Sequence, residues 1–158
     1  MHDTIETLLK ELLEAMDFPF SAIERQEVAG QTVFSVRSDD ARRLIGGKGD
    51  TIQALDMLVK KMVEKRLPAA SATEEEAEAP RFLIDVNDYR VKQIKDLQTK
   101  ARMMAERARS FEYDVELTPM SAYERLIIHT TLQDAPNIKT ESQGEGRNRR
   151  VVIKYSAN

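Results

Sequence analysis

The chain has 158 residues, of which 41% are hydrophobic and 32% charged, so it can bury one ordinary core or two small ones. It contains no cysteine and only two histidines, which excludes disulfides, thiolate chemistry and a histidine-rich metal site. No run of residues is apolar for long enough to span a membrane, and residues 1–10 lack the basic and apolar order of a signal peptide. We therefore expect a cytoplasmic protein without membrane insertion, metal or cofactor.

The net charge of −3 is unevenly distributed along the chain. Residues 67–80 carry four acidic residues and no basic one, whereas residues 87–158 carry thirteen basic and ten acidic residues. A local basic patch decides nucleic-acid binding more than total charge does, so the acidic balance weakens this function class without excluding it. The Ala- and Glu-rich residues 67–80 predict a flexible acidic insertion.

The first half of the chain predicts six elements around this insertion. In order they are a helix at 3–16, strands at 21–28 and 31–37, a short helix from 38, a helix from about 50 to 66, and a strand at 81–86. We expect Asp3 or Thr4 to cap the first helix and Ser38 to cap the second. One sheet covered by helices on one face is the natural arrangement. On the third helix the spacing predicts a buried stripe of Ile52, Leu55, Leu58, Val59, Met62 and Val63.

A glycine-rich corner separates the second and third predicted helices. Gly46 and Gly49 lack a Cβ, so the backbone there can take positive φ and approach other groups closely. The helix that begins near Asp50 points free N–H groups at the corner, and Lys48 adds a full charge. The corner therefore predicts an anion site. A helix C-cap glycine followed by a turn explains one of its glycines but not all three.

Spacing excludes two nucleotide-binding loops at this corner. A Walker loop needs Ser or Thr after its lysine, where this chain has Gly49, and a dinucleotide fingerprint beginning at Gly47 needs a small residue at Ile52. With the order of elements, the Ile-Gly-Gly-Lys-Gly loop at 45–49 resembles that of a type II KH domain. This resemblance implies that the loop backbone lies against the phosphates of a single strand of about four nucleotides.

The second half predicts a long helix from Asp88 to about Arg109, capped by Asn87, and a strand at 113–117. We expect the basic side chains of the long helix to form a solvated face and its methionines to pack in the core. A further helix follows Ser121, which forms a capping box with Glu124.

Arg125 and His129 lie four residues apart on this last helix and so share a face. Arg125 should disfavour protonation of His129, leaving a neutral ring that can stack or donate one hydrogen bond while the guanidinium takes a phosphate. A general base would need a second catalytic group, which is not evident, so we expect no enzyme. The pair should mark the exposed stripe, because the other faces carry residues expected to be mostly buried: Tyr123, Leu126, Ile127, Ile128 and Leu132.

The surrounding sequence makes the Arg125/His129 pair more specific. Residues 119–129, 132–134 and 145–153 closely resemble the RxxxH single-stranded nucleic-acid-binding domain of bacterial Jag (SpoIIIJ-associated) proteins, a family that joins a KH domain directly to an RxxxH domain. The resemblance extends from about Thr4 to Tyr155. It implies an α+β chain with a type II KH domain at 1–87, which includes the acidic insertion, and a small α/β RxxxH domain at 88–158.

The resemblance also implies a function and a set of binding residues. The chain is expected to be a non-enzymatic, cytoplasmic binder of single-stranded RNA, with single-stranded DNA as a second ligand. It is further expected to regulate transcripts in connection with cell-envelope or division control and to pair with a small KH-only protein. The expected nucleic-acid-binding residues are Gly46, Gly47, Lys48 and Gly49 in the loop, Arg125 and His129, and Arg149 and Arg150 at a basic strand start.

Three departures from the family pattern and one alternative function stay open. One departure is the acidic insertion, which is either inert or repels nonspecific nucleic acid. A separate N-terminal Jag domain is not recognised in this sequence, and the loop has one basic residue, Lys48, where relatives often have two. The alternative is a protein-interaction adaptor with weakened or lost RNA binding, which holds a partner at a sheet edge or an apolar groove. The sequence does not decide the oligomeric state.

Overall fold

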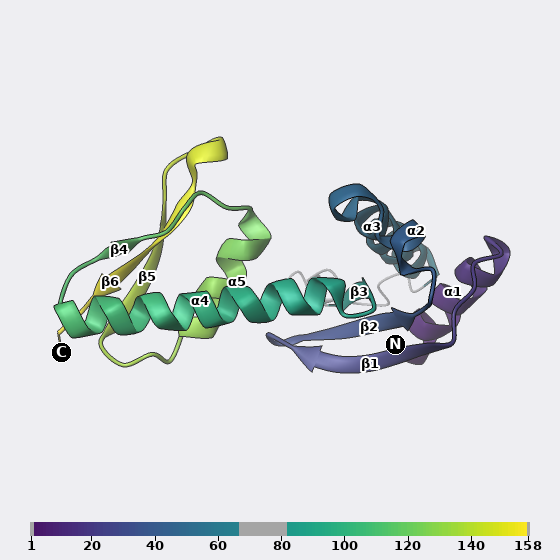
Figure 1. Ribbon diagram of the computed structural model, residues 1–158, viewed down its shortest axis with the longest axis horizontal. Coiled ribbons are helices and arrows are strands. Elements are labelled where there is room, and N and C mark those ends of the chain that lie inside the picture. Colours follow the sequence, from purple (N-terminus) through teal and green to yellow (C-terminus); the bar gives the residue numbers. More distant parts are fainter. Residues whose placement is uncertain (1, 67–81, 158) are drawn as a thin grey trace. The chain divides into compact units, whose positions relative to one another are not determined.

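The computed structural model describes residues 2–66 and 82–157, and the predicted acidic insertion lies outside the described residues. The chain divides into two compact units, Met1–Val91 and Lys92–Asn158. Each unit combines helices with a three-stranded sheet, which confirms the predicted α+β class (Figure 1).

The first unit has the predicted order of helices and strands. Its strand order is β1-β2-β3, with β1 and β2 antiparallel and β2 and β3 parallel. Ala29 and Gly30, between β1 and β2, have φ of 52° and 75°, the geometry of the tight turns that suit a twisted hairpin. The elements are α1 (His2–Ala15), β1 (Ala22–Val28), β2 (Gln31–Arg37), α2 (Ala41–Ile45), the 3-10 turn η1 (Gly47–Gly49), α3 (Asp50–Arg66) and β3 (Phe82–Val86).

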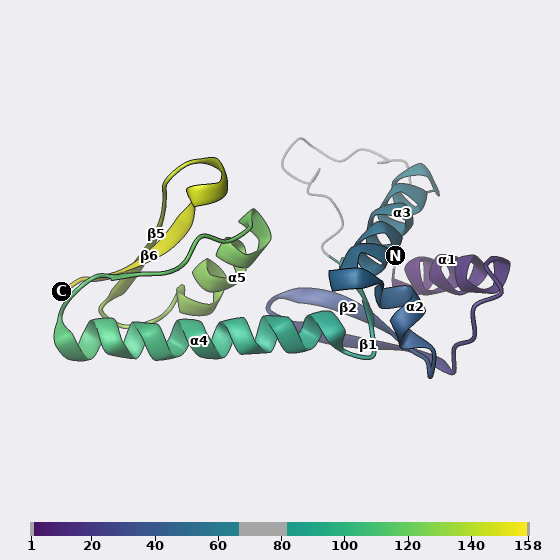
Figure 2. The same ribbon diagram turned by 45° about the horizontal axis from the view of Figure 1, so that its top comes forward.

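The helices α1, α2 and α3 pack against one face of this sheet, as predicted, and Figures 1 and 2 both show α2 and α3 on the same side of β2. Phe34 from β2 and Ile84 from β3 are fully buried on that face. Leu58 does not belong to the buried stripe, since Leu55 and Val59 take the core-facing positions of α3 and leave Leu58 47% exposed. The helical side of the core consists of Ile5, Leu8, Leu9, Leu13, Leu44, Ile52, Leu55, Val59 and Val63.

The predicted caps of the first two helices are wrong. α1 begins at His2, so Asp3 and Thr4 lie inside its first turn. α2 begins at Ala41, and the Ser38 hydroxyl instead accepts the N–H of Asp40 at 3.1 Å. The same hydroxyl donates to the carbonyl of Pro19 at 2.6 Å. Ser38 therefore fixes the turn between β2 and α2 rather than the helix itself.

The predicted cap of the long helix α4 (Tyr89–Phe111) is also wrong. Asn87 takes a left-handed conformation with φ of 48°, and its side chain bonds the backbone N–H and carbonyl of Ser38 at 3.1 and 2.7 Å. Asn87 thus ties the end of β3 to the end of β2. The first N–H groups of α4 must find another acceptor.

Asp85 supplies that acceptor from inside β3. Its carboxylate is fully buried and accepts the N–H groups of Val86 at 2.7 Å and of Arg90 and Val91 at 2.9 Å each. Burial raises the pKa of Asp85, and the three backbone N–H groups oppose this shift. Sequence reasoning missed Asp85 because it lies within an otherwise apolar strand pattern.

Arg37 organises a second polar cluster on the face of the sheet that bears Asp85. It donates to Glu24 at 2.8 Å and to Asp88 at 2.7 Å, while Gln26 donates to Asp88 at 2.8 Å. The hydrogen bonds to Glu24 and Asp88 raise the pKa of Arg37. Burial alone would raise the pKa of Asp88, but the contacts with Arg37 and Gln26 lower it. The cluster links β1, β2 and the segment before α4.

The second unit is built on a sheet of order β4-β6-β5 in which all neighbours are antiparallel. α4 and α5 contribute to one core with this sheet, and the alanines of α4, at positions 101, 105 and 108, let the helix approach the strands closely. The strand predicted at 113–117 is shorter than expected, and β5 was not predicted. The elements are β4 (Val115–Glu116), α5 (Ala122–Leu132), β5 (Ile138–Gln143), the 3-10 turn η2 (Gly146–Asn148) and β6 (Arg150–Tyr155).

Replacing Asp85 by asparagine tests its role in holding the start of α4. One carboxylate oxygen becomes an amide donor that faces a backbone N–H, and this N–H then lacks a partner at a buried site. We expect the free energy of unfolding to fall by about 1–3 kcal/mol. The matched control is Asp39→Asn at an exposed position, which should change it by less than about 0.5 kcal/mol. Denaturant unfolding measures both, and equal effects of the two substitutions would contradict this role.

Candidate nucleic-acid interface

The first turn of α5 is fixed by the predicted capping box. The hydroxyl of Ser121 accepts the N–H of Glu124 at 3.2 Å, and the carboxylate of Glu124 accepts the N–H of Ser121 at 2.8 Å. Two of the free donors at the helix N-terminus are thereby satisfied. Arg125 follows directly and His129 one turn later, so both side chains project from a rigid helix.

His129 is held through both nitrogens of its ring. Nδ1 lies 2.7 Å from the hydroxyl of Thr140, and Nε2 lies 3.0 Å from the hydroxyl of Ser142. Both hydroxyls belong to β5, so the ring pins α5 to the sheet. A neutral imidazole has one donor and one acceptor, and a hydroxyl can serve either. In this arrangement no ring nitrogen is left for a ligand, contrary to the expectation that His129 can donate a hydrogen bond.

Burial, and then the nearby charge of Arg125, lower the pKa of His129 from its ordinary value of 6.5. The predicted effect of Arg125 is thus confirmed, although burial is the larger cause. His129 is therefore neutral at pH 7. Of the two members of the pair, only Arg125 carries a charge.

Arg125 is half-buried and anchored at one end of its guanidinium. Nη1 donates to the carbonyl of Met120 at 2.9 Å, while the N–H of Met120 donates to the carbonyl of Arg149 at 3.1 Å. One residue, Met120, therefore connects Arg125 to the start of β6. A guanidinium has five N–H donors in a fixed fork, so the oriented group keeps donors for a phosphate.

Arg149 and Arg150, predicted together, lie in different surroundings. Ser142 pairs with Val151 across β5 and β6, and Gln143 pairs with Arg150. Val151 is buried in the core beneath the helices, so alternation places Arg150 on the opposite face. There it forms an ion pair with Glu116. Arg149 is exposed, and its backbone is joined to Met120, next to Arg125.

The predicted exposure of α5 is wrong at Leu126. This side chain is 59% exposed, whereas Arg125 and His129 are half-buried. The cause is the pair of contacts that draws His129 against β5 and turns the predicted buried position outward. An apolar side chain at the surface next to Arg125 can pack on the face of a base or sugar.

In the glycine corner of the first unit, Gly46 and Gly49 have structural roles, whereas Gly47 lies at an open tip. Gly46 is the C-cap of α2 with φ of 75° and ψ of −175°, and a Cβ there would lie 2.2 Å from the hydroxyl oxygen of Thr51. Gly49 has φ of 87°, and its Cβ would lie 3.2 Å from the ring of Tyr89. Gly47 would place a Cβ in open space. The first two glycines therefore shape the loop, and Gly47 needs no glycine for conformation or packing.

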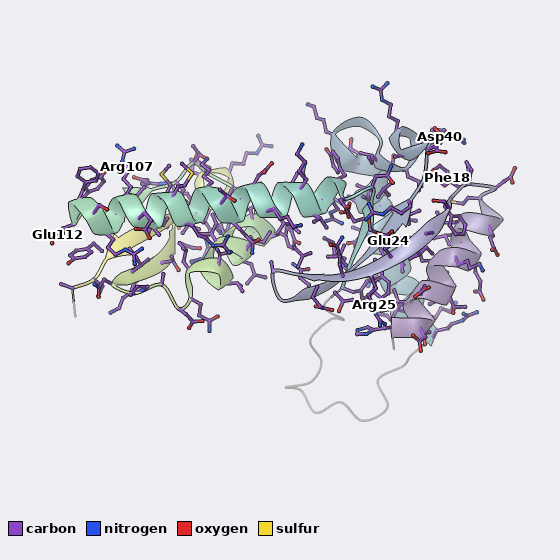
Figure 3. All side chains as sticks on the ribbon, turned by 60° about the horizontal axis from the view of Figure 1, so that its bottom comes forward. Phe18, Glu24, Arg25, Asp40, Arg107 and Glu112 are labelled. Carbon is purple, nitrogen blue, oxygen red and sulfur yellow. The ribbon has the colours of Figure 1, made fainter. Side chains whose placement is uncertain are left out.

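Two exposed cations lie on this loop and on the helix that precedes it. Lys48 is exposed in a left-handed conformation, with φ of 57° and ψ of 17°. Arg42, in α2, is also exposed, and neither forms an ion pair with a residue among 2–66 and 82–157. Its neighbour Arg43 is instead paired with Asp40 at 2.9 Å, near the ring of Phe18; Figure 3 labels Asp40 and Phe18. Sequence reasoning counted Lys48 alone and missed Arg42, although two arginines stand three and four residues before Gly46.

A family model for the R-3-H domain, which is the RxxxH domain of the sequence analysis, matches residues 95–155. This segment is therefore similar to an RxxxH domain. This domain covers nearly all of the second unit and includes Arg125, His129 and both strands that flank them. The prediction of an RxxxH domain from its motif is thereby confirmed. The type II KH interpretation of the first unit rests on the order of its elements and on the loop at 46–49.

The chain is also similar to proteins named RNA-binding protein KhpB. It is 29% identical over 154 residues to the protein of Clostridium symbiosum, covering 97% of this chain and 65% of that one. It is 31% identical over 137 residues to the protein of Bacillus subtilis, covering 85% and 62%. It is 28% identical over 118 residues to the protein of Streptococcus pneumoniae, covering 75% of this chain and 33% of that one. The chain therefore spans less than two thirds of these relatives. The similarity confirms the predicted resemblance to an RNA-binding family.

A membrane-spanning helix and a metal site are both absent from the described part of the chain. Among residues 2–66 and 82–157, none of the helices has the length and apolar character needed to span a membrane. The same residues include no group of three His, Asp or Glu side chains that could hold a metal ion.

Replacing Gly46 and Gly47 separately by alanine tests the division of the corner. At Gly46 the new Cβ meets Thr51, and the backbone lies in a region open only to glycine, so we expect about 1–3 kcal/mol of destabilisation. Gly47→Ala is the matched control and should leave the free energy of unfolding within about 0.5 kcal/mol. Thermal or denaturant unfolding measures the difference. If Gly47→Ala is the more damaging substitution, the described loop geometry is wrong.

The lowered pKa of His129 predicts a pH dependence of stability. Above about pH 6.5 both the folded and the unfolded chain hold a neutral ring, and stability from this group is complete. As the pH falls below 6.5 the unfolded state binds a proton first, so stability decreases until the folded pKa is reached. His129→Gln cannot titrate and should lose this part of the dependence below about pH 6.5 in unfolding experiments. Unchanged dependence in the variant would show that another group is responsible.

Proposed function

We propose that this chain binds single-stranded RNA at two surfaces and regulates RNA rather than catalysing a reaction. The observation that carries the proposal is the anchored guanidinium of Arg125 within an RxxxH domain. Arg125 uses one donor on Met120, stands beside a neutral His129, and lies near the exposed Arg149. Such a group can take a phosphate through paired N–H donors while the exposed Leu126 contacts a base or sugar.

His129 acts in this proposal as a positioning residue. Its nitrogens are bonded to Thr140 and Ser142, so it would have to break one of these contacts to serve as a general base. Its neutral state also avoids repulsion with Arg125. Both features support a binding function over an enzymatic one.

The loop at 46–49 provides the second surface. Gly47 and Lys48 form its open tip, with the start of α3 directly behind them, and the N–H groups of a helix start attract an anion. Lys48, assisted by Arg42, supplies full positive charge. A single strand of a few nucleotides bound in the manner of a KH domain would place its backbone here.

Relatives that are named RNA-binding proteins support RNA as the natural ligand. Single-stranded DNA belongs to the proposal as a second ligand. A cytoplasmic location, a link to cell-envelope or division control, and a small KH-only partner follow from the family resemblance and belong to this proposal. The proposal also includes a KH domain at residues 1–87 and an RxxxH domain at residues 88–158.

The adaptor alternative receives little support at the outer edge of β3. Strand addition needs free backbone groups along a sheet edge. The N–H of Ile84 is already bonded to Asp56 at 2.9 Å, and its carbonyl accepts from Arg90 at 3.3 Å. Lys60 binds the same Asp56 at 2.8 Å. A partner strand would have to displace these side chains.

Arg125→Ala tests the RxxxH surface through its salt dependence. If Arg125 contacts one phosphate of a single strand, the slope of log affinity against log salt should fall by about 0.7. Arg150→Ala is the matched control, because Arg150 lies on the opposite face in an ion pair with Glu116, and should leave the slope unchanged. Fluorescence anisotropy with a short labelled oligonucleotide at several salt concentrations measures both. An unchanged slope and affinity for Arg125→Ala would contradict its assigned role.

The loop surface is tested by Gly47→Asp combined with Lys48→Asp. Neither substitution strains the fold, since Gly47 has open space around it and aspartate tolerates the left-handed conformation of Lys48. The loop loses its one cation and gains two carboxylates at the phosphate contact, so RNA affinity should fall at least about tenfold. Thr7→Asp with Lys10→Asp makes the same charge change on the exposed side of α1 and serves as the control. Equal affinities of the two double variants would exclude the loop as a binding surface.

A further inference from the structure

The end of α4 exposes two aromatic rings that no part of the binding site described above uses. Phe111 is 67% exposed and Tyr113 is 42% exposed. Their ring centroids lie 6.0 Å apart, with the planes inclined by 37°. Glu112 between them takes a left-handed conformation with φ of 52°, which reverses the chain and sets Tyr113 beside Phe111. A non-glycine residue takes this conformation at a cost of about 1 kcal/mol.

Helix-end packing alone does not account for this pair. An apolar contact often closes the end of a helix, but it then buries the side chains concerned. Here both side chains stay exposed to solvent. Arg107 also fixes the orientation of Tyr113, because Nε donates to the tyrosine hydroxyl at 2.8 Å. Figure 3 labels Arg107 near the end of α4 and Glu112 at that end.

The rings continue a stripe of cationic and apolar side chains along α4. Lys100, Met103, Arg107 and Phe111 follow one another at helical spacing, whereas positions 101, 105 and 108 face the core. Met103 is 62% exposed, so its interpretation as core filler is wrong. The acidic Glu106 lies off this stripe and is paired with Arg109. No acidic side chain among the described residues pairs with Lys100 or Arg107.

We propose that this stripe is a third contact for single-stranded RNA, in which Phe111 and Tyr113 stack on bases and Lys100 and Arg107 bind the backbone. Open aromatic faces beside cations are the two elements of single-strand binding surfaces, and stacking tolerates any base. A neutral apolar peptide would leave both cations unpaired. The inference rests on the proposed function and deepens it, since it extends the contact from phosphate capture to base stacking.

A fluorescent reporter tests the stacking directly, because the chain contains no tryptophan. Phe111→Trp places a single indole in the pair, and Met57→Trp places one on α3 at a similar exposure of 61%. Addition of a short oligouridine or oligoadenosine of about ten nucleotides should quench the fluorescence of the F111W variant at least about twofold more than that of M57W. Equal quenching of the two variants at saturating RNA would overturn the inference.

Affinity provides the second readout. Phe111→Ala with Tyr113→Ala removes both rings from exposed positions and should lower affinity for the same strand about fivefold or more, with the salt slope unchanged. Phe111→Trp should retain the affinity of the wild type. If wild type binds RNA and the double alanine variant binds equally well, this inference fails and the proposed function stands. If wild type binds no single strand at low salt, the proposed function fails and the inference with it.

Discussion

The two hydrogen bonds from the ring of His129 to Thr140 and Ser142 are the interaction on which the second unit's candidate site depends. They join α5 to β5 at a fixed rotation of the helix about its axis. That rotation holds Arg125 in a half-buried position over the carbonyl of Met120 and turns Leu126 outward. Burial of the ring keeps it neutral, so the one charge of the pair resides on the guanidinium. The histidine thus sets the geometry, and the arginine presents the donors.

In the glycine corner, too, some residues fix the geometry and others are exposed for binding. Gly46 and Gly49 are required by positive φ and by close contacts with Thr51 and Tyr89, so they fix the path of the loop. Gly47 and Lys48 carry no such constraint and form the exposed tip. In both units a rigid local structure holds a cation at the surface, where it is free to meet a phosphate. Side-chain entropy lost on binding is smaller when the geometry is fixed beforehand.

The sequence predicts correctly those features that depend on residues close to one another in the chain. The helices, the hairpin at Ala29 and Gly30, the capping box at Ser121 and the two nucleic-acid motifs all have local signatures. It failed where a residue's partner is distant in sequence. Asp85 caps α4 from within a strand, and Ser38 and Asn87 bond each other instead of capping helices. Strand register separates Arg149 from Arg150, and the unpredicted β5 supplies both partners of His129. The domain limits at 87 and 88 stay a prediction.

The central claim is that Arg125 contacts the nucleic acid while His129 remains bound to β5. The most direct test is nuclear magnetic resonance of the side-chain nitrogens of both residues during titration with a short single-stranded RNA. We expect the guanidinium resonances of Arg125 to shift on binding, and the ring resonances of His129 to remain those of a neutral, hydrogen-bonded imidazole. Unmoved Arg125 resonances at saturating RNA, or a His129 ring that becomes protonated or exchanges its partners, would contradict the claim.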